Sequence, residues 1–382
     1  MLTIYAIIVA AIGLYAFLLS TMNIFAMKSY APKKPEITTD GPMISVLIPA
    51  RDEEQNLPAT LEALLIQDYR NFEIIVCDDN SSDGTWEVVS RYMQMDSRVR
   101  GIQGKPLADG WRGKNYAVQQ LIHAAHGEYV LITDADIHHS PDSLSYGYSA
   151  LVKNKVDMIS GYARETVRSM WTQTLISASL FITVLYVPLP LQRRRPRPAW
   201  AMAIGQYLFV RKAALDSIGG FASFRNIVTD DIELARTIVR NGFKMQFLDL
   251  NPILRVNMYD DFRSAFKGIS RSVYHMAKSS MLPFFIVIVL LLYLLGLTPL
   301  VVLALSFPVY AHTVPILPYA LLLGGTLLLY GSWIRSALFH NYRFSTALLG
   351  PSVFIIVGST YIYGMYLKVS KRGMTWKGRP LN

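Results

Sequence analysis

Apolar residues form long uninterrupted runs near the two ends of the chain, whereas short apolar and polar segments alternate in the middle. Leu2 to Met22 is uncharged and apolar, and a membrane-spanning helix takes roughly 20 such residues. Three more apolar runs follow towards the C-terminus: Leu282 to Phe307, Ile316 to Trp333 and Thr346 to Leu367. The pattern predicts an N-terminal anchor, an aqueous domain and a C-terminal membrane cluster.

The first apolar run has two interpretations, a cleaved signal peptide or a retained anchor. No positively charged segment precedes its apolar part and no small-residue cleavage site precedes Lys28, which favours the retained anchor. Lys28, Lys33 and Lys34 follow the run directly, and positively charged flanks stay in the cytoplasm. We therefore expect a multi-pass protein of the cell membrane whose aqueous domain is cytoplasmic.

The number of membrane crossings stays open from the sequence. An anchor and three C-terminal spans would place the basic C-terminal tail outside the cell, against the charge rule. Pro299 and Pro308 interrupt the run from Leu282 to Phe307, so this run can instead be re-entrant or lie at the interface. We expect an even number of crossings and a cytoplasmic tail.

In the middle of the chain, apolar runs of strand length alternate with segments of helical spacing. Strands are predicted over residues 44–49, 73–76, 98–103 and 129–133, and helices over 53–67, from 83 onwards and over 115–125. Such alternation favours an α/β fold in which helices cover both faces of a parallel sheet. In open sheets of this kind, ligands bind outside the carboxyl ends of the strands.

Acidic residues follow three of the predicted strands directly. They are Asp52 and Glu53, Asp78 and Asp79, and Asp134 and Asp136. The last two form a D-A-D sequence after an apolar strand, and alternate side chains of an extended segment share a face. Both carboxylates can therefore approach one hard cation, which prefers oxygen ligands. A lone D-x-D is a weak signal, because strand-end acids are commonly solvated, but the presence of acidic residues at three strand ends strengthens it.

The composition of the 382 residues agrees with a membrane enzyme. Hydrophobic residues make up 52% and the mean hydropathy is +0.28, too apolar for an ordinary soluble enzyme. The net charge of +10 suits nucleic acid or anionic lipid, but the chain has no zinc spacing, RNA-binding signature or basic helix with interleaved aromatics. Its basic residues cluster beside apolar segments instead, which favours lipid headgroups and argues against nucleic acid. These clusters are Arg193, Arg194, Arg195 and Arg197, and Lys368, Lys371, Arg372, Lys377 and Arg379.

Three residues with reactive side chains are interpreted as structural. Cys77, the only cysteine, lies in an apolar run and has no disulfide partner within the chain. His138 and His139 suggest zinc, but no further ligand falls at a workable spacing. We expect both histidines to be polar loop residues.

Four motifs stand in a fixed order along the aqueous domain. They are I-P-A-R-D-E-E from Ile48, V-C-D-D-N-S-S-D-G-T from Val76, D-A-D from Asp134 and T-D-D from Thr229. Together they resemble the membrane-bound inverting glycosyltransferases of family 2, and the likeness covers residues 44–241. The resemblance implies a GT-A (Rossmann-like, nucleotide-sugar-binding) cytosolic domain with N-terminal and C-terminal transmembrane helices.

Two further segments narrow the resemblance. G-W-R-G-K from Gly110 and W-K-G-R from Trp376 resemble the branch that glycosylates membrane lipids. Carotenoid glucosyltransferases and hopanoid-associated glycosyltransferases belong to this branch. The partners that it implies are a UDP-hexose donor and a lipid acceptor within the bilayer.

The resemblance also implies a donor site at the strand ends. Mg²⁺ or Mn²⁺ would lie between the diphosphate and the pair Asp134 and Asp136, with Asp136 the firmer ligand. At least one of Asp78 and Asp79 would contact the nucleoside, although a turn that caps the next helix is the plainer interpretation. Lys114 would meet a diphosphate oxygen from a helix start, unless it is a surface lysine. The same pocket would be shaped by Pro49, Arg51 and Glu53.

Inverting transfer needs one base to accept the proton of the attacking hydroxyl. The resemblance assigns this role to the second acid of an E-D pair, here Asp231, with Asp230 as the alternative. Helical spacing follows the pair, so these acids are expected at a helix N-terminus, where a carboxylate is stabilised. Helix capping alone is the plainer interpretation.

One family motif is incomplete. Many relatives carry Q-x-x-R-W before the membrane cluster, and this chain keeps only Arg271. Arg271 would contact the diphosphate or face lipid. The missing glutamine and tryptophan make a processive polymerase less favoured.

These patterns divide the chain into four parts. Residues 1–27 form the anchor, residues 40–280 the GT-A domain, residues 281–368 the membrane cluster and residues 369–382 a basic cytoplasmic tail. Two interfacial helices are expected within the GT-A domain, at about 174–192 and 260–280. The first is apolar and followed by arginines, as is typical of a helix that lies in the plane of the bilayer surface.

We expect metal-dependent, inverting transfer of a hexose, glucose in particular, from a UDP-sugar to a membrane lipid at the cytoplasmic face. A processive polysaccharide synthase with the same donor site is the first alternative. A catalytically inactive scaffold or transporter is the second, although a transporter would carry intramembrane charge, which the apolar runs almost lack.

Overall fold

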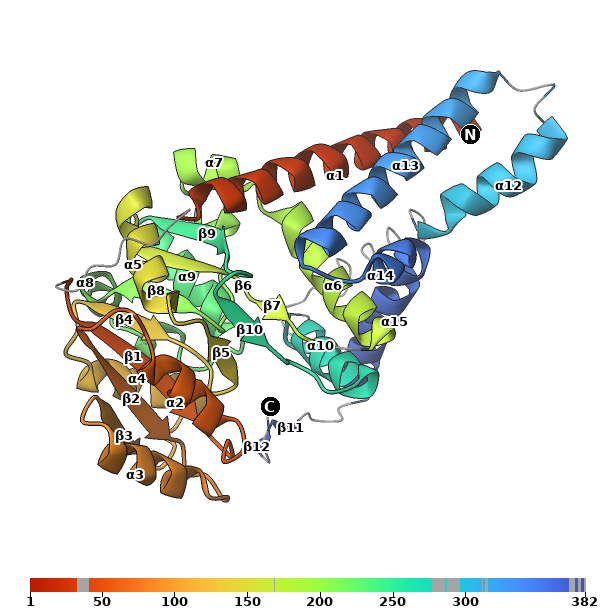
Figure 1. Ribbon diagram of the computed structural model, residues 1–382. Helices are drawn as coiled ribbons and strands as arrows, with labels where there is room; N and C mark the ends of the chain where they lie inside the picture. Colours follow the sequence, from red (N-terminus) through yellow and green to blue (C-terminus); the bar gives the residue numbers. More distant parts are fainter. Residues whose placement is uncertain are drawn as a thin grey trace. The chain divides into compact units, whose positions relative to one another are not determined.

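The computed structural model (Figure 1) describes residues 1–32, 41–167, 169–276, 286, 296–310, 312, 315–370, 375–376 and 379–380. The chain divides into two compact units. Met1–Phe25, Val167–Pro188 and Met258–Asn382 form the helical unit, and Ala26–Thr166 and Leu189–Asn257 form the sheet unit. Half of the predicted run from Leu282 to Phe307 lies outside the described residues, as do Lys33, Lys34, Lys371, Arg372 and Lys377.

A seven-stranded sheet is the centre of the sheet unit, with the order β3-β2-β1-β4-β8-β6-β9. Its strands are β1 (Ile44–Ala50), β2 (Phe72–Asp78), β3 (Val99–Gln103), β4 (Tyr129–Ile132), β6 (Met158–Tyr162), β8 (Leu208–Arg211) and β9 (Met245–Asp249). The first four strands match those predicted from the apolar runs, within a few residues at each end.

The sheet is mixed, so the expectation of a parallel sheet was wrong for one strand. β1 pairs in parallel with β2 and β4, and β2 with β3, whereas β8 runs antiparallel to both β4 and β6. Ile132 at the end of β4 stands opposite Leu208 at the start of β8. Because β8 is reversed, the residues that precede it lie at the same edge as the carboxyl ends of β1, β2 and β4.

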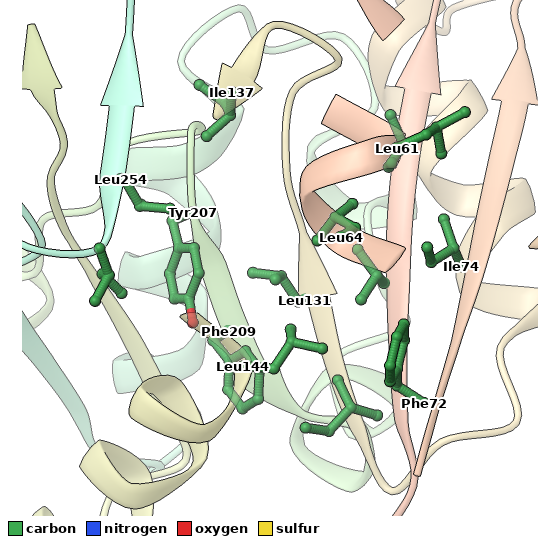
Figure 2. Close-up of a cluster of buried hydrophobic side chains, with 14 of the residues drawn as sticks. Leu61, Leu64, Phe72, Ile74, Leu131, Ile137, Leu144, Tyr207, Phe209 and Leu254 are labelled. Atoms are coloured by element: carbon green, nitrogen blue, oxygen red, sulfur yellow. The ribbon is translucent and has the colours of Figure 1, made fainter. Parts of the chain in front are cut away.

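Successive residues of the central strands are buried on opposite faces of the sheet, which is why these strands are almost entirely apolar. Val46 and Ile48 of β1 belong to one core and Leu47 to the other, and all three are 0% exposed. Figure 2 shows part of the first core, where Leu61 and Leu64 pack near Phe72 and Ile74.

Each face of the sheet is covered by its own set of helices. Apolar residues of α2 (Leu57–Leu65), α3 (Thr85–Met95) and α5 (Ser143–Asn154) belong to the first core. Those of α4 (Gly113–Ala124), α8 (Lys212–Ser217) and α9 (Asp230–Arg240) belong to the second. The remaining elements of the unit are α7 (Leu189–Arg194), η1 (Pro198–Trp200), η2 (Ala222–Phe224) and a small sheet of β5 (Ile137–His139), β10 (Leu254–Val256) and β7 (Arg164–Glu165).

The helical unit contains the predicted membrane segments that fall on described residues. Its elements are α1 (Leu2–Tyr30, which ends in the sheet unit), α6 (Met170–Tyr186), α10 (Phe262–Met276), α12 (Thr298–Tyr310), α13 (Ile316–Phe339), α14 (Phe344–Leu348), α15 (Gly350–Val369), β11 (Thr375–Trp376) and β12 (Arg379–Pro380). By length and composition, α1 and α13 could each cross a membrane. This finding is consistent with membrane association.

Glycines bring α1 and α13 into close contact. A Cβ atom placed on Gly13 would lie 2.1 Å from the carbonyl oxygen of Gly325, and one placed on Gly325 would lie 2.6 Å from Cα of Ala10. The Arg335 guanidinium of α13 also donates to the Phe17 carbonyl and to Ser20 Oγ, both at 2.9 Å. Small residues that let two helix backbones approach are common between membrane helices.

The segment expected as one in-plane helix is two helices. α6 ends at Tyr186, α7 begins at Leu189, and Pro188 lies between them. Proline cannot donate a backbone hydrogen bond and disfavours helical conformation in the residue before it. The first of these helices belongs to the helical unit and the second to the sheet unit.

Candidate active site

The carboxyl ends of β2, β1 and β4 bring the predicted donor-site residues to one edge of the sheet. These three strands are neighbours, and Ala50 at the end of β1 stands opposite Asp78 at the end of β2. Pro49 lies within β1, while Arg51, Asp52 and Glu53 follow it directly. The predicted donor-site residues of the sheet unit therefore lie close together, because the strands that carry them are neighbours.

The loops after β1 and β2 are joined by hydrogen bonds. The Arg51 guanidinium donates to the carbonyls of Asp79 at 2.7 Å and Asn80 at 3.0 Å. The Glu53 N–H donates to Thr85 Oγ1 at 2.8 Å. Asp52 has φ of 52°, a left-handed conformation that costs energy in residues other than glycine. Its carboxylate accepts from the Ser82 N–H at 2.7 Å, which helps to hold that conformation.

Asp78 and Asp79 are both buried beside these loops, at 7% and 4% exposed. Asp78 Oδ1 accepts from the N–H of Ser81 at 3.0 Å and from its hydroxyl, so this carboxylate stabilises the turn before α3. Asp78 therefore stabilises the turn before the next helix, which was the plainer interpretation of this residue from the sequence. Nucleoside contact by either residue stays a prediction.

Lys114 joins the two acidic motifs of the site. It is the second residue of α4, where a helix start was predicted, and its Nζ lies 2.6 Å from Asp134 Oδ1. Burial alone would lower the pKa of Lys114, but attraction to Asp134, Asp230 and Asp231 outweighs burial and raises it. The single positive charge of Lys114 thus attracts three carboxylates, which come from two distant segments of the chain.

Asp231 is held in one orientation by two backbone donors. Its Oδ2 accepts from the Gly205 N–H at 2.9 Å and its Oδ1 from the Ile232 N–H at 2.8 Å. A Cβ atom on Gly205 would lie 3.3 Å from Lys114 Nζ and 3.8 Å from Asp231 Oδ2, so glycine leaves room for both charged groups. As predicted, the acid pair stands at the start of a helix, α9.

Burial raises the pKa values of both acids. Desolvation raises the pKa of Asp230, Lys114 counteracts it, and the negative charges of Asp231 and Asp134 add to it. Burial likewise raises the pKa of Asp231, although hydrogen bonds from Ile232 and Gly205 work in the opposite direction. Adjacent carboxyls that influence each other in this way titrate as a pair. A carboxylate with a raised pKa is a stronger base than an ordinary aspartate.

The D-A-D residues lie beyond their strand, so the argument from one face of an extended segment was wrong. β4 ends at Ile132, and Asp134 and Asp136 lie in the turn that follows. Asp134 faces Lys114, whereas Asp136 is exposed. Although the residue is exposed, the surrounding protein partly desolvates its carboxyl group, and this desolvation together with the negative charges of Asp134 and Glu53 raises the pKa of Asp136 to about 6.

This donor set fits a hard divalent cation only in part. Two carboxylates within electrostatic reach of each other supply the oxygen ligands that Mg²⁺ prefers, and the repulsion between them is what a cation would relieve. No group of three or more His, Cys, Asp or Glu side chains suited to a metal occurs among the described residues. Mg²⁺ commonly binds through one or two carboxylates and completes its shell with water and substrate phosphates.

α4 fixes the loop that leads into the acid pair. The buried Asn115 amide donates to the carbonyls of Phe224, Arg225 and Ile227 at 3.2, 3.3 and 3.0 Å. One turn further on, Gln119 Oε1 accepts from the Phe221 N–H at 2.7 Å. Lys114 and the start of α9 are therefore held together through α4.

A buried polar chain supports the turn after β4. Thr133 Oγ1 donates to the Gln206 carbonyl at 2.9 Å and lies 3.1 Å from His139 Nε2, and His139 Nδ1 lies 3.1 Å from Ser143 Oγ. Burial lowers the pKa of His139 to about 3, so its ring is neutral. Both histidines lie on β5, so the expectation of loop residues was wrong.

The structure thus groups the predicted site residues that lie in the sheet unit. Arg271 lies on α10 in the helical unit, and its contact with a diphosphate stays a prediction. Sequence reasoning missed the contributions of Gly205, Asn115 and Thr133. A single glycine or asparagine carries no motif, and Gly205 reaches the site only because β8 is antiparallel.

Comparisons with known proteins agree with this geometry. The family model described as Glycosyl transferase family 21 matches residues 3–382. A beta-monoglucosyldiacylglycerol synthase of Nostoc sp. is 26% identical over 205 residues, which cover 52% of this chain and 42% of that protein. The probable glycosyltransferase YdaM of Bacillus subtilis is 26% identical over 224 residues, or 56% of this chain and 51% of that protein. The chain spans about half or less of the length of these relatives.

A solved structure shares the fold. The mannosyltransferase PcManGT from Pyrobaculum calidifontis, in complex with GDP-Man and Mn²⁺, is 18% identical with a TM-score of 0.57, and the match covers 97% of this chain and 100% of that chain. The predicted GT-A fold is confirmed. The motifs were compared with family 2, whereas the matching family model carries the number 21. The chain belongs to Glycosyl transferase family 21.

Proposed function

We propose that this glycosyltransferase moves a hexose, glucose in particular, from a UDP-sugar to a hydroxyl group of a membrane lipid, with inversion at the anomeric carbon. The observation that carries the proposal is the Lys114–Asp134 ion pair at 2.6 Å, with Asp230 and Asp231 within electrostatic reach of the same ammonium. A cation for a diphosphate and a base for an acceptor are thereby adjacent. The names of the relatives, among them a glucosyldiacylglycerol synthase, support the lipid acceptor and the glucosyl donor.

Asp231 is the proposed base. Its carboxylate accepts the proton of the acceptor hydroxyl as that oxygen forms a bond to the anomeric carbon. The bond between this carbon and the diphosphate oxygen breaks on the opposite side, and the nucleoside diphosphate leaves with the electron pair. The two backbone donors to Asp231 support this role, because they fix its carboxylate before the substrate arrives.

The nucleotide is proposed to bind at the ends of β1 and β2. Asp78 and Asp79 lie there, beside the loop that Arg51 and Glu53 help to hold. Lys114 would exchange its contact with Asp134 for a diphosphate oxygen, acting as a compact positive charge. Arg271 is proposed as a second diphosphate contact.

Asp134 and Asp136 are the proposed ligands of Mg²⁺ or Mn²⁺. When bound, the metal would neutralise charge on the departing diphosphate. Asp136 is the firmer proposed ligand because its exposed carboxylate is not paired with Lys114 as Asp134 is. Asp134 would both bind the cation and orient Lys114.

We also propose the division into an anchor (1–27), a GT-A domain (40–280), a membrane cluster (281–368) and a basic tail (369–382). The catalytic domain would face the cytoplasm of a multi-pass protein. Lys28, just past the apolar part of α1, supports this orientation through the charge rule.

The test of the base is Asp231→Asn in the purified full-length protein. Transfer should fall by about 10²-fold or more, because the variant cannot accept a proton, while UDP binding should change little. Glu233→Gln is the matched control, since Glu233 lies in the first turn of the same helix. Retained transfer would remove Asp231 from the role, and lost UDP binding would show that it belongs to the donor site.

The test of the metal is removal by a chelator. Transfer should stop and should return when Mg²⁺ or Mn²⁺ is added in excess. The variant Asp136→Asn should raise the metal concentration needed for half-maximal transfer more than Asp216→Asn, which changes an exposed acid of α8 that pairs with Lys212. Full activity in the presence of chelator would end the metal proposal.

A further inference from the structure

The sheet unit carries a strongly basic surface that the transfer reaction does not use. It consists of Lys28 at the end of α1, Lys153 at the end of α5, and Arg193, Arg194, Arg195 and Arg197 in and after α7. We call these six residues the basic surface. All six are exposed, and the segments that carry them (26–32, 150–156 and 189–200) contain no acidic residue.

Hydrogen bonds hold these three segments together, so the surface is built rather than a chance cluster of charged tails. Lys153 Nζ donates to the Ala31 carbonyl at 2.8 Å, and the Asn154 amide donates to the Tyr30 carbonyl at 2.9 Å. Arg193 in turn donates to Asn154 Oδ1 at 2.9 Å, and its guanidinium lies 4.4 Å from the centre of the Tyr30 ring. The end of α1 and α7 consequently lie side by side (Figure 1).

The arginines after α7 are presented to solvent by a second set of contacts. The Arg197 N–H donates to Gln192 Oε1 at 3.0 Å, and its guanidinium lies 4.8 Å from the centre of the Trp200 ring. Arg194 and Arg195 form no ion pair with a carboxylate in the described part of the chain. Their charges are therefore available to an external anion.

Apolar side chains accompany the charges. Leu191 is 45% exposed on α7, and Val152 is 54% exposed on α5 beside Lys153. Exposed aliphatic side chains, arginines and a tryptophan near one another are typical of surfaces that lie at a lipid headgroup layer. A surface for a soluble polyanion would not need exposed leucine and valine.

The position of Lys28 along α1 agrees with a surface that lies at the level of the lipid headgroups. If Leu2 to Met22 fills the hydrocarbon core, Lys28 lies six residues further along a continuous helix, about 9 Å beyond that core at 1.5 Å per residue. The headgroup region begins directly outside the roughly 30 Å hydrocarbon layer.

We propose that the basic surface binds the phosphate groups of anionic phospholipids and gives the protein a preference for anionic membranes. The proposal goes beyond the transfer reaction and does not depend on it, because the surface includes none of the residues assigned to the donor site or to the base. The partner is identified by charge complementarity with six exposed basic residues, of which Arg194 and Arg195 form no ion pair in the described part of the chain, and by continuity with the apolar helix α1.

The test uses the full-length protein in zwitterionic detergent, mixed with equal amounts of phosphatidylglycerol and phosphatidylcholine, and native mass spectrometry to count retained lipids. Wild-type protein should retain phosphatidylglycerol in preference. Arg194→Gln/Arg195→Gln should lower the retained ratio by about threefold or more, since each basic residue near an anionic surface contributes on the order of 1 kcal/mol. Arg193 is left unchanged because it holds Asn154 and Tyr30.

The control is Arg70→Gln/Arg91→Gln, which removes two exposed arginines elsewhere on the sheet unit. Its lipid ratio should equal that of the wild type, and the unfolding temperatures of both double variants should match the wild type. An equal retention of the two lipids by the wild type would overturn the proposal. So would a ratio for Arg194→Gln/Arg195→Gln that does not differ from the control.

Discussion

At the scale of single residues, the site is an unequal balance of charge. Lys114 is the one cation that interacts with Asp134, Asp230 and Asp231 in the described part of the sheet unit. The net effect is that both residues of the acid pair keep raised pKa values despite the nearby ammonium. The proposed cation binding and the proposed proton transfer would both need such an excess of carboxylate.

The first prediction concerns the pH dependence of transfer. The base must be ionised, and burial raises the pKa of Asp231, so the rate should rise with pH above the ordinary aspartate range of about 4. Lys114→Met removes a charge that lowers this pKa, so the rising limb should move to higher pH by about 1 unit or more, together with a loss of rate. Lys212→Met, which breaks a surface ion pair with Asp216, should leave the midpoint unchanged. A midpoint that is the same in all three proteins would contradict the prediction.

The second prediction concerns stability. The folded-state pKa of Asp230 is raised by burial, so the folded protein keeps this proton at pH values where the unfolded chain has lost it. As the pH rises from about 4 to above the raised pKa of Asp230, the loss of this proton lowers the free energy of unfolding of the wild type. Asp230→Asn should be more stable than the wild type at pH 8, by on the order of 1–3 kcal/mol, and similar to it at pH 4. Thermal unfolding at both pH values measures this, and a variant that is less stable at pH 8 would refute it.

At the scale of elements, one contact between elements organises each unit. In the sheet unit, α4 carries Lys114 into the site and also ties the loop that precedes α9. In the helical unit, α1 and α13 approach through glycines. The first arrangement depends on Lys114 and Asn115, and the second on Gly13 and Gly325.

The third prediction tests the loop contact of α4. Asn115→Leu preserves volume but leaves the carbonyls of Phe224, Arg225 and Ile227 without this donor. Loss of a buried hydrogen-bond partner costs about 1–3 kcal/mol, so the unfolding free energy should fall by that amount and proteolysis within 221–229 should increase. Gln94→Leu, at an exposed position of α3, is the control. Unchanged proteolysis in Asn115→Leu would show that the loop is held by other means.

The fourth prediction tests the crossing of α1 and α13. Gly325→Val places a Cβ 2.6 Å from the backbone of Ala10, so the helices must separate. Overpacking of this kind costs about 1–3 kcal/mol, which should appear as a lower unfolding temperature in detergent. Gly324→Val is matched in type and neighbouring in sequence, and nothing lies within 4 Å of its Cβ. Equal unfolding temperatures for the two variants would contradict the close crossing.

At the scale of the whole molecule, the sheet unit and the helical unit are assembled from interleaved segments. The chain leaves and re-enters each unit, so neither unit is one continuous segment of the sequence. Such a layout would suit the proposed transfer to a membrane lipid, because a lipid acceptor stays within the bilayer.

The fifth prediction concerns the product. Arg271 stands without the glutamine and tryptophan that accompany it in processive relatives, so we expect one sugar per lipid. Mass spectrometry of lipids incubated with the purified protein and UDP-glucose should show a single hexose added. A ladder of longer products would support the polysaccharide synthase instead.

Much of this protein follows from local sequence. Strands β1 to β4, the helices between them and the start of α9 were predictable because periodicity and strand-end acids are properties of neighbouring residues. The order of the motifs alone indicated the glycosyltransferase family. The apolar helices α1 and α13 were predictable for the same reason, because each is a continuous run of mostly apolar residues.

Only the tertiary structure decided how these pieces meet. The reversal of β8 brings the Gly205 N–H to Asp231, the turn after β4 points Asp134 towards Lys114, and Asn115 reaches carbonyls more than a hundred residues away. Each of these contacts joins residues far apart in the chain, so its formation depends on strand order and packing. Local propensity carries no information about either.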